Sequence, residues 1–358
     1  MIFKNIGLFK KLFFLLFLIF VLVYLIFYIY QVKVGEFLID RGIYEDCKDF
    51  HWETASLENS DHKVAHYFKK EGVGVPIVIL PGGSMEASML CPFAEVFKDQ
   101  KRPLFIFENP GHGKAKVASA KVLREEVLSG KHWVLSYAKH FQNLLQKIKI
   151  KKFDLIGYSL GGGSGALLVG EIPEKIGKAI FVAPAGFSMV YTKSFIKVIK
   201  EGRLKETYAW ESLEEFESLL EYIHMDHKQI PIFLKKSIVK KRLKYYGEGY
   251  WDAYFNSYKN IDITYPDKVL KVLLKGKKLP PILVVGLEKD KIIDINKLPH
   301  FSRLLDGEFV KVIGSGHAGH SKKTPLIKSF FLGLSPLMNK FLDSSDAEHP
   351  KVLGPINF

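Results

Sequence analysis

Cysteine is scarce in this chain of 358 residues, which holds only Cys47 and Cys91. Neither lies in a CxxC pair or beside a cluster of histidines, so the sequence argues against a structural zinc site and against a framework of several disulfides. The pairing of these two thiols with each other is left open, because it depends on export to an oxidising compartment.

A recognisable nucleic-acid-binding module is also missing, although the net charge is +14 and the pI is about 9.4. The lysines are spread along the chain and do not form one basic stripe. We therefore expect no nucleic-acid partner, and we interpret the basic surface as one that faces anionic lipid.

Charge, glycine and proline are all absent from residues 12–30, LFFLLFLIFVLVYLIFYIY. At about 1.5 Å per residue, a helix of this length crosses a hydrocarbon layer of about 30 Å. Lys4, Lys10 and Lys11 precede the run, so the positive-inside rule predicts a single-pass protein with a cytoplasmic N-terminus and its main domain on the periplasmic, extracellular or lumenal side. A cleaved signal peptide is the alternative, but the run exceeds the usual length of about 7–15 residues and has no small-x-small cleavage site.

Beyond this run, short apolar segments alternate with helical patterns, as in an α/β fold with a mostly parallel sheet and helices on both faces. The expected strands are residues 63–68, 76–80, 104–107, 153–157, 178–182, 282–285 and 308–313. Aromatic and basic helical patterns replace this rhythm between residues 187 and 279, which indicates an inserted lid. The expected division is a cytoplasmic N-terminus (1–11), a transmembrane helix (12–30), a juxtamembrane segment (31–62), a core in two parts (63–186 and 280–334), the lid (187–279) and a C-terminal tail (335–358).

A candidate nucleophile lies in FDLIGYSLGGG, residues 153–163, where a strand pattern leads through Gly-x-Ser-x-Gly into a helix-compatible segment. In this context Ser159 is expected on a sharp turn at the carboxyl end of its strand, with the N–H of Leu160 directed at developing negative charge. A phosphate-binding turn is the competing interpretation, but no Lys-Ser/Thr pair and no GxGxxG occur here.

A serine hydroxyl needs a base and a group that orients the base. Asp290 and His317 follow Ser159 in the order acid then base, each in the loop after an expected strand. Asp294 is an alternative acid and His320 an alternative base, but the spacing from Gly286 favours Asp290, and His320 lies deeper in its loop.

Five segments together resemble the α/β-hydrolase superfamily over residues 63–334: VILPGGS (78–84), FENPGHGKA (107–115), IGYSLGG (156–162), GLEKDKII (286–293) and GSGHAGHSKKTP (314–325). The resemblance implies a sheet of the eight-stranded type, a lid after the sixth core strand, and an oxyanion hole built from Leu160 and Gly83, with Ser84 as the alternative to Gly83. Glu108 stands where the family usually has Asp, and we expect it to be structural.

These residues predict a membrane-anchored serine hydrolase that cleaves a carboxylic ester through an acyl-enzyme, with no metal and no organic cofactor. The aromatic lid and the anchor favour a hydrophobic or lipid ester, with residues 12–30 in the bilayer. Acyl transfer, or cleavage of a thioester, an amide or a carbon–carbon bond, is an alternative on the same fold, and a non-catalytic tethered binding protein is an alternative of another class. The sequence leaves the oligomeric state open.

Overall fold

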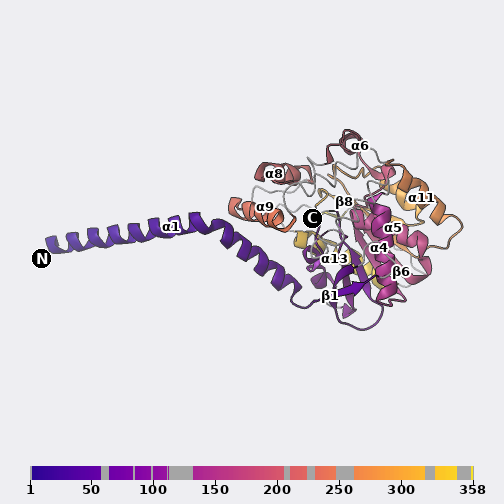
Figure 1. The fold of residues 1–358 in the computed structure, drawn as a ribbon, viewed down its shortest axis with the longest axis horizontal. Helices are drawn as coiled ribbons and strands as arrows, with labels where there is room; N and C mark the ends of the chain where they lie inside the picture. Colours follow the sequence, from indigo (N-terminus) through magenta and orange to yellow (C-terminus); the bar gives the residue numbers. More distant parts are fainter. Residues whose placement is uncertain are drawn as a thin grey trace.

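A computed structural model describes residues 2–57, 64–83, 85–97, 100–110, 112, 132–204, 210–223, 230–246, 262–318, 327–344 and 356–357. A long N-terminal helix projects from a body in which helices surround one sheet (Figure 1). Within the described residues the sheet has nine strands in the order β1-β2-β4-β3-β5-β6-β7-β8-β9. They are β1 (His51–Ser56), β2 (Val64–Lys70), β3 (Ile77–Leu80), β4 (Leu104–Phe107), β5 (Phe153–Tyr158), β6 (Ile176–Val182), β7 (Ile282–Leu287), β8 (Glu308–Ile313) and the two-residue β9 (Ile356–Asn357).

The first two strands run antiparallel to their neighbours, and all pairings from β3 to β9 are parallel. Strands β3, β4, β5 and β7 are buried along their whole length, as strands covered on both faces should be. The carboxyl ends of β5, β7 and β8 therefore meet at one edge of the sheet, where loops can bring polar side chains together.

The predicted strands all occur in the sheet, with bounds that shift by up to two residues, and Lys63 lies outside the described residues. Two further strands, β1 and β9, were not predicted. In β1 only Ala55 is buried, because this strand lies at the edge of the sheet. The strand was not predicted because its largely polar sequence lacks the apolar pattern of a core strand.

Helix α5 (Leu160–Glu171) packs against β5 and β6 and also contacts α4 (Trp133–Lys147) and α11 (Tyr265–Leu274). Helix α12 (Leu298–Leu304) lies against β7 and β8, and α13 (Ile327–Asp343) contacts the short α2 (Phe93–Val96). Helix α13 crosses residue 334, where the core was expected to end. Its buried Leu337, Met338 and Phe341 place this part of the expected tail in the core.

The segment between β6 and β7 contains η5 (Ser188–Val190), α6 (Lys193–Lys200), α8 (Leu213–Tyr222), α9 (Ile232–Tyr246) and α11. We call α6, α8 and α9 the cap helices. Trp210 and Phe216 join Leu219, Leu220 and Val239 in a small apolar cluster that is separate from the main core. Helices α8 and α9 therefore share a hydrophobic centre of their own, whereas the buried residues of α6 belong to the main core.

Helix α1 (Ile2–Cys47) is longer than the predicted run of residues 12–30. It continues because residues 31–47 contain no proline, the strongest helix breaker. Among the described helices, one stretch, Lys10–Tyr28, is long and apolar enough to cross a membrane, and none of it is buried against the rest of the chain. Figure 1 shows α1 running straight from the N-terminus and bending before it reaches the body.

The two cysteines form a disulfide between Cys47, the last residue of α1, and Cys91, which follows η1 (Ala87–Leu90). This settles the pairing that the sequence left open. The bond ties the end of α1 to the segment that follows β3.

Candidate active site

Ser159 lies on the turn between β5 and α5 with φ of +51° and ψ of −117°, a conformation that residues with a side chain rarely adopt. Two glycines make the turn possible. A Cβ atom on Gly157 would lie 2.5 Å from the carbonyl oxygen of Gly161, and one on Gly161 would lie 2.3 Å from the carbonyl oxygen of Leu80. The Gly-x-Ser-x-Gly spacing is thus required by close backbone contacts, and the serine is held at the carboxyl end of its strand.

Two hydrogen bonds link the three polar side chains that the sequence singled out. The Oγ of Ser159 lies 2.9 Å from Nε2 of His317, and Nδ1 of His317 lies 2.7 Å from Oδ2 of Asp290. Because a carboxylate only accepts, Nδ1 carries the proton, and Nε2 is left to accept from the serine hydroxyl. This is the arrangement that the expected nucleophile, base and orienting acid would need.

The carboxylate of Asp290 is fixed by its own loop. Its Oδ1 accepts hydrogen bonds from the N–H groups of Ile292 at 2.8 Å and Ile293 at 2.9 Å, and only 1% of its side chain is exposed. Asp294, the alternative acid, instead accepts from the N–H of Asn296 at 3.1 Å. His320, the alternative base, lies outside the described residues.

The expected oxyanion donors lie beside the serine. Leu160 is the first residue of α5, so its N–H has no acceptor within the helix and lies at the positive end of the helix dipole. A Cβ atom on Gly83 would lie 3.6 Å from Cδ2 of Leu160, which puts the two residues side by side. The preceding residue is held by the Asn109 side chain, whose Nδ2 donates to the carbonyl oxygen of Gly82 at 2.8 Å. Ser84 lies outside the described residues.

Tyr158 contacts His317 at the candidate site, and the sequence did not predict this contact. Its buried hydroxyl donates to the main-chain carbonyl oxygen of His317, and its ring lies 5.9 Å from the imidazole. Burial, with a smaller effect of Asp290, raises the pKa of the phenol, which keeps it a donor. The position next to the serine gave no signal of this long-range contact.

The segment after β4 holds two buried ionisable groups. The carboxyl group of Glu108 accepts from the N–H of Ala87 at 3.0 Å, and burial, with the charge of Glu86, raises its pKa well above the usual value despite that bond. Nδ1 of His112 donates to the carbonyl oxygen of Pro110 at 3.0 Å, and burial lowers the pKa of His112 to about 4. Both contacts are within the loops around the site, in keeping with a structural use.

The carboxyl end of α8 reaches the histidine loop. The N–H of Ala318 donates to the carbonyl oxygen of Ile223 at 3.3 Å. Burial and the charge of Asp290 raise the pKa of Tyr222 to about 12, and the ring of Tyr222 lies 6.5 Å from that of Phe195 on α6. Part of the expected aromatic lid therefore lies next to the three polar side chains. Tyr208, Tyr250, Trp251 and Tyr254 of that lid lie outside the described residues, and the side chains of Tyr245 and Tyr246 are not described.

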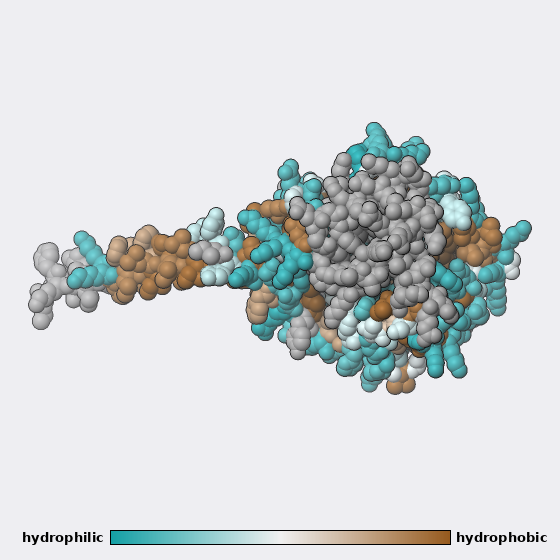
Figure 2. All heavy atoms as spheres, in the orientation of Figure 1, coloured by the Kyte–Doolittle hydropathy of each residue, from teal (hydrophilic) through white to brown (hydrophobic). Residues whose placement is uncertain are grey.

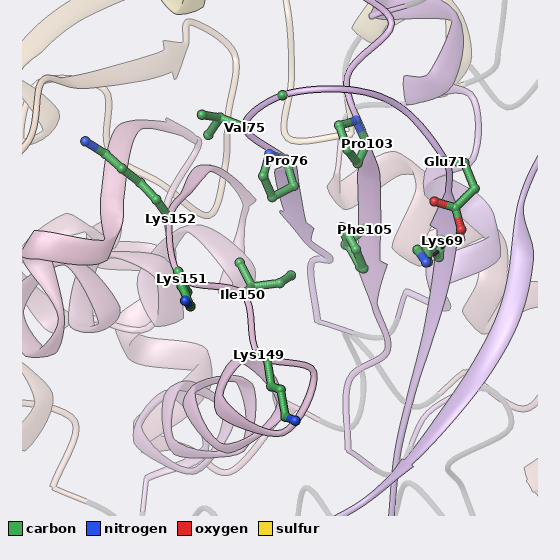
Figure 3. Close-up of a pocket in the computed structure, with 11 residues that line it drawn as sticks. Lys69, Glu71, Val75, Pro76, Pro103, Phe105, Lys149, Ile150, Lys151 and Lys152 are labelled. Carbon is green, nitrogen blue, oxygen red and sulfur yellow. Dashed lines mark ion pairs between the residues drawn. The ribbon is translucent and has the colours of Figure 1, made fainter.

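A surface cavity of ≈ 540 Å³ lies elsewhere (Figure 3). Val75, Pro76 and Pro103, which precede β3 and β4, line it together with Lys149, Ile150, Lys151 and Lys152, which precede β5. It is at the amino ends of these strands, whereas Ser159 follows the carboxyl end of β5, so the cavity does not serve the serine. Within the described residues no three His, Cys, Asp or Glu side chains come together as metal ligands.

Comparisons with known proteins identify the fold family. A family model for the alpha/beta hydrolase fold matches residues 75–324. "Putative esterase/lipase 2" of Mycoplasma pneumoniae is 26% identical over an alignment of 218 residues that covers 58% of this chain and 75% of that protein. Protein phosphatase methylesterase 1 of Kluyveromyces lactis is 24% identical over an alignment of 269 residues that covers 67% of each chain.

Two solved structures show the same fold. A membrane phospholipase A, described as a bacterial virulence factor, has a TM-score of 0.60 at 14% identity. The match covers 93% of this chain and 100% of that protein's chain. A carboxylesterase from Bacillus subtilis has a TM-score of 0.58 at 15% identity and covers 87% and 99%. At these identities the likeness shows the fold alone. The match of the family model shows that the chain belongs to the α/β-hydrolase fold family, and its relatives in sequence carry esterase or lipase names.

Proposed function

We propose that this chain is a serine hydrolase that cleaves carboxylic esters, with Ser159 as nucleophile, His317 as base and Asp290 as the acid that orients the base. The observation that carries the proposal is the 2.9 Å contact between Ser159 Oγ and His317 Nε2. The esterase and lipase names of the sequence relatives favour ester cleavage over other chemistry on this fold.

In the proposed reaction, His317 removes the proton of Ser159 as its oxygen attacks the ester carbonyl, and the carboxylate of Asp290 stabilises the imidazolium that forms. The N–H groups of Leu160 and Gly83 stabilise the oxyanion. His317 then protonates the leaving alcohol, and water, activated by the same base, releases the acid from the acyl-enzyme.

The substrate we propose is a hydrophobic or lipid ester at a membrane that α1 crosses through Lys10–Tyr28. Lys10 and Lys11 at the start of this stretch favour a cytoplasmic N-terminus and a catalytic domain on the other side. The disulfide between Cys47 and Cys91 supports the same orientation, since such bonds persist in oxidising compartments.

Labelling with a fluorophosphonate tests the nucleophile directly, because this reagent forms a covalent bond only with an activated serine. We expect wild type in membranes to be labelled and Ser159→Ala not to be. The matched control is Ser164→Ala, which removes a buried serine of α5, the helix that follows Ser159; the Oγ of Ser164 donates to the carbonyl oxygen of Val134. That variant should still be labelled. Equal labelling of wild type and Ser159→Ala would reject the assignment.

A further inference from the structure

Helix α9 packs along the N-terminal helix α1. The rings of Phe27 and Phe233 meet edge to face with centroids 5.6 Å apart. One turn further on, the Oγ of Ser237 donates to the carbonyl oxygen of Val32 at 2.9 Å. A Cβ atom on Gly35 would lie 2.0 Å from that same Oγ, so glycine permits this close approach. The α1 helix is thus joined to the cap as well as to the core.

The contacts also give the direction of α9. Phe27, Val32 and Asp40 of α1 meet Phe233, Ser237 and Lys241 of α9 in that order, the last as an ion pair between Asp40 and Lys241. Numbers rise together on both helices, so the two run parallel. Phe27 belongs to the apolar stretch Lys10–Tyr28, and the amino end of α9 therefore lies at the level where this stretch ends.

The residues at that end of α9 are apolar and partly uncovered. Ile232 is 55% exposed, Pro231 before it is exposed, and Ile230 is half-buried. Cations follow on both helices. At about 1.5 Å per residue, Lys236 lies about 5 Å beyond Phe233, and Lys33 lies about 7 Å beyond Tyr28. Both lysines are exposed, and apolar residues followed by lysines are the order found where a protein leaves the hydrocarbon for the headgroup layer.

The hydropathy of the molecular surface changes in the same order, from apolar to hydrophilic. In Figure 2 the apolar surface of α1 gives way to hydrophilic atoms where the helix meets the body. Figure 1 places α9 at this junction, with α8 next to it.

We propose that the amino end of α9, residues 230–233, inserts into the interfacial layer of the bilayer beside α1, while Lys33 and Lys236 contact the lipid headgroups. The inference rests on the proposed membrane span. It gives the cap a second lipid contact that is continuous with the first through Phe27 and Phe233.

The contact between α1 and α9 is connected to the proposed catalytic residues through helix α8. On α9 the guanidinium of Arg242 stacks over the ring of Trp210 at 4.0 Å, and Val239 shares the cap cluster with residues of α8. Helix α8 in turn ends at Tyr222, beside the histidine loop. A series of packed side chains thus connects the amino end of α9 with the loop that carries His317.

Depth-dependent fluorescence quenching tests the insertion. Because the only two native cysteines are joined to each other, one introduced cysteine can be labelled alone with an environment-sensitive dye in the full chain, reconstituted in vesicles that contain anionic lipid. The labelled variants are Ile232→Cys, Phe20→Cys within the apolar stretch, and Val272→Cys on α11. Val272 is 75% exposed and serves as the matched control.

We expect the label at position 232 to show a blue shift and to be quenched by spin-labelled lipids that carry the label near the headgroup. The label at position 20 should be quenched by lipids labelled deep in the acyl chain, and the label at position 272 by neither. Quenching at 20 without quenching at 232 would reject the insertion of α9. Absence of quenching at both position 20 and position 232 would reject the membrane span itself, and with it this inference.

An activity comparison separates the inference from the proposed chemistry. Ile232→Asp should lower hydrolysis of an ester embedded in vesicles and leave hydrolysis of a short water-soluble ester unchanged, whereas Val272→Asp should change neither. An equal effect of Ile232→Asp on both esters would contradict the inference. Absence of ester hydrolysis in wild type would contradict the proposed function, while the quenching result would still stand on its own.

Discussion

The hydroxyl of Tyr158 donates to the main-chain carbonyl oxygen of His317, a residue 159 positions further along the chain. Tyr158 directly precedes the proposed nucleophile, so one residue positions the serine through its backbone and the histidine loop through its side chain. Ser159 and His317, the two sides of the proposed catalytic contact, are thereby held relative to each other.

Tyr158→Phe keeps the ring and removes only this hydrogen bond. A bond of this kind contributes on the order of 1 kcal/mol, so we expect kcat to fall by up to about tenfold. KM should stay close to that of wild type, because the residue is expected to position the base and not to bind substrate. Steady-state kinetics with a soluble ester measure both values. An unchanged kcat would show that the histidine loop holds its place without Tyr158.

Asp290→Asn tests the acid. The amide no longer fixes the tautomer of His317 that accepts from Ser159, and in comparable triads such a change lowers kcat by about 10⁴. Asp294→Asn is the matched control, because Asp294 lies four residues away and its carboxylate accepts from the N–H of Asn296 in its own turn. We expect this control to keep activity close to wild type. If Asp294→Asn lost as much activity as Asp290→Asn, the assignment of the acid would be overturned.

The disulfide between Cys47 and Cys91 closes a loop with a sequence separation of 44 residues. Cross-links of this loop size stabilise folded proteins by about 2–4 kcal/mol. The double variant Cys47→Ala/Cys91→Ala should therefore unfold at a lower temperature than the oxidised wild type. Reduction of the wild type should reproduce most of this loss. Thiol counting on denatured protein provides the control: we expect no free thiol before reduction and two afterwards.

His112 predicts a dependence of stability on pH. Its pKa is about 4 in the folded chain and 6.5 in the unfolded one, so the neutral form is favoured by folding. The stabilisation is complete above pH 6.5 and is lost as the pH falls toward 4, by on the order of 3 kcal/mol.

His112→Gln, which cannot titrate, should flatten this part of the profile of melting temperature against pH. Buried His132, whose pKa is lowered to about 3, contributes the same sign in both proteins, and the difference between the profiles removes it. Parallel profiles for wild type and His112→Gln would contradict the prediction.

The sequence predicted what depends on local patterns. Strands 104–107 and 308–313 have the expected bounds, because each is a short run with a clear period or full burial. The serine turn was predictable because Gly157 and Gly161 lie only two positions on either side of Ser159. Asp290 and His317 were predicted as partners of Ser159 from their order in the chain and from their places in the loops after two expected strands.

The features that the sequence did not predict depend on contacts that no short sequence pattern indicates. The edge strand β1 has a polar sequence, and the extension of α1 to Cys47 follows an apolar run that ends 17 residues earlier. The bond of Tyr158 to His317 and the packing of α9 on α1 join segments far apart in the chain. Such pairings arise only when the whole fold brings surfaces together.

Three residues, 48–50, separate the end of α1 from β1, and the disulfide ties that end to the core a second time. The protein therefore has no slack between its N-terminal helix and its sheet. Residues 29–47 form about 28 Å of helix. They hold the sheet at a fixed distance from the apolar stretch, whereas a flexible linker would let that distance vary. With the proposed span in the bilayer, the catalytic domain would stay at a fixed height above the leaflet. Substrates embedded in the same leaflet would then have to reach it by lateral diffusion.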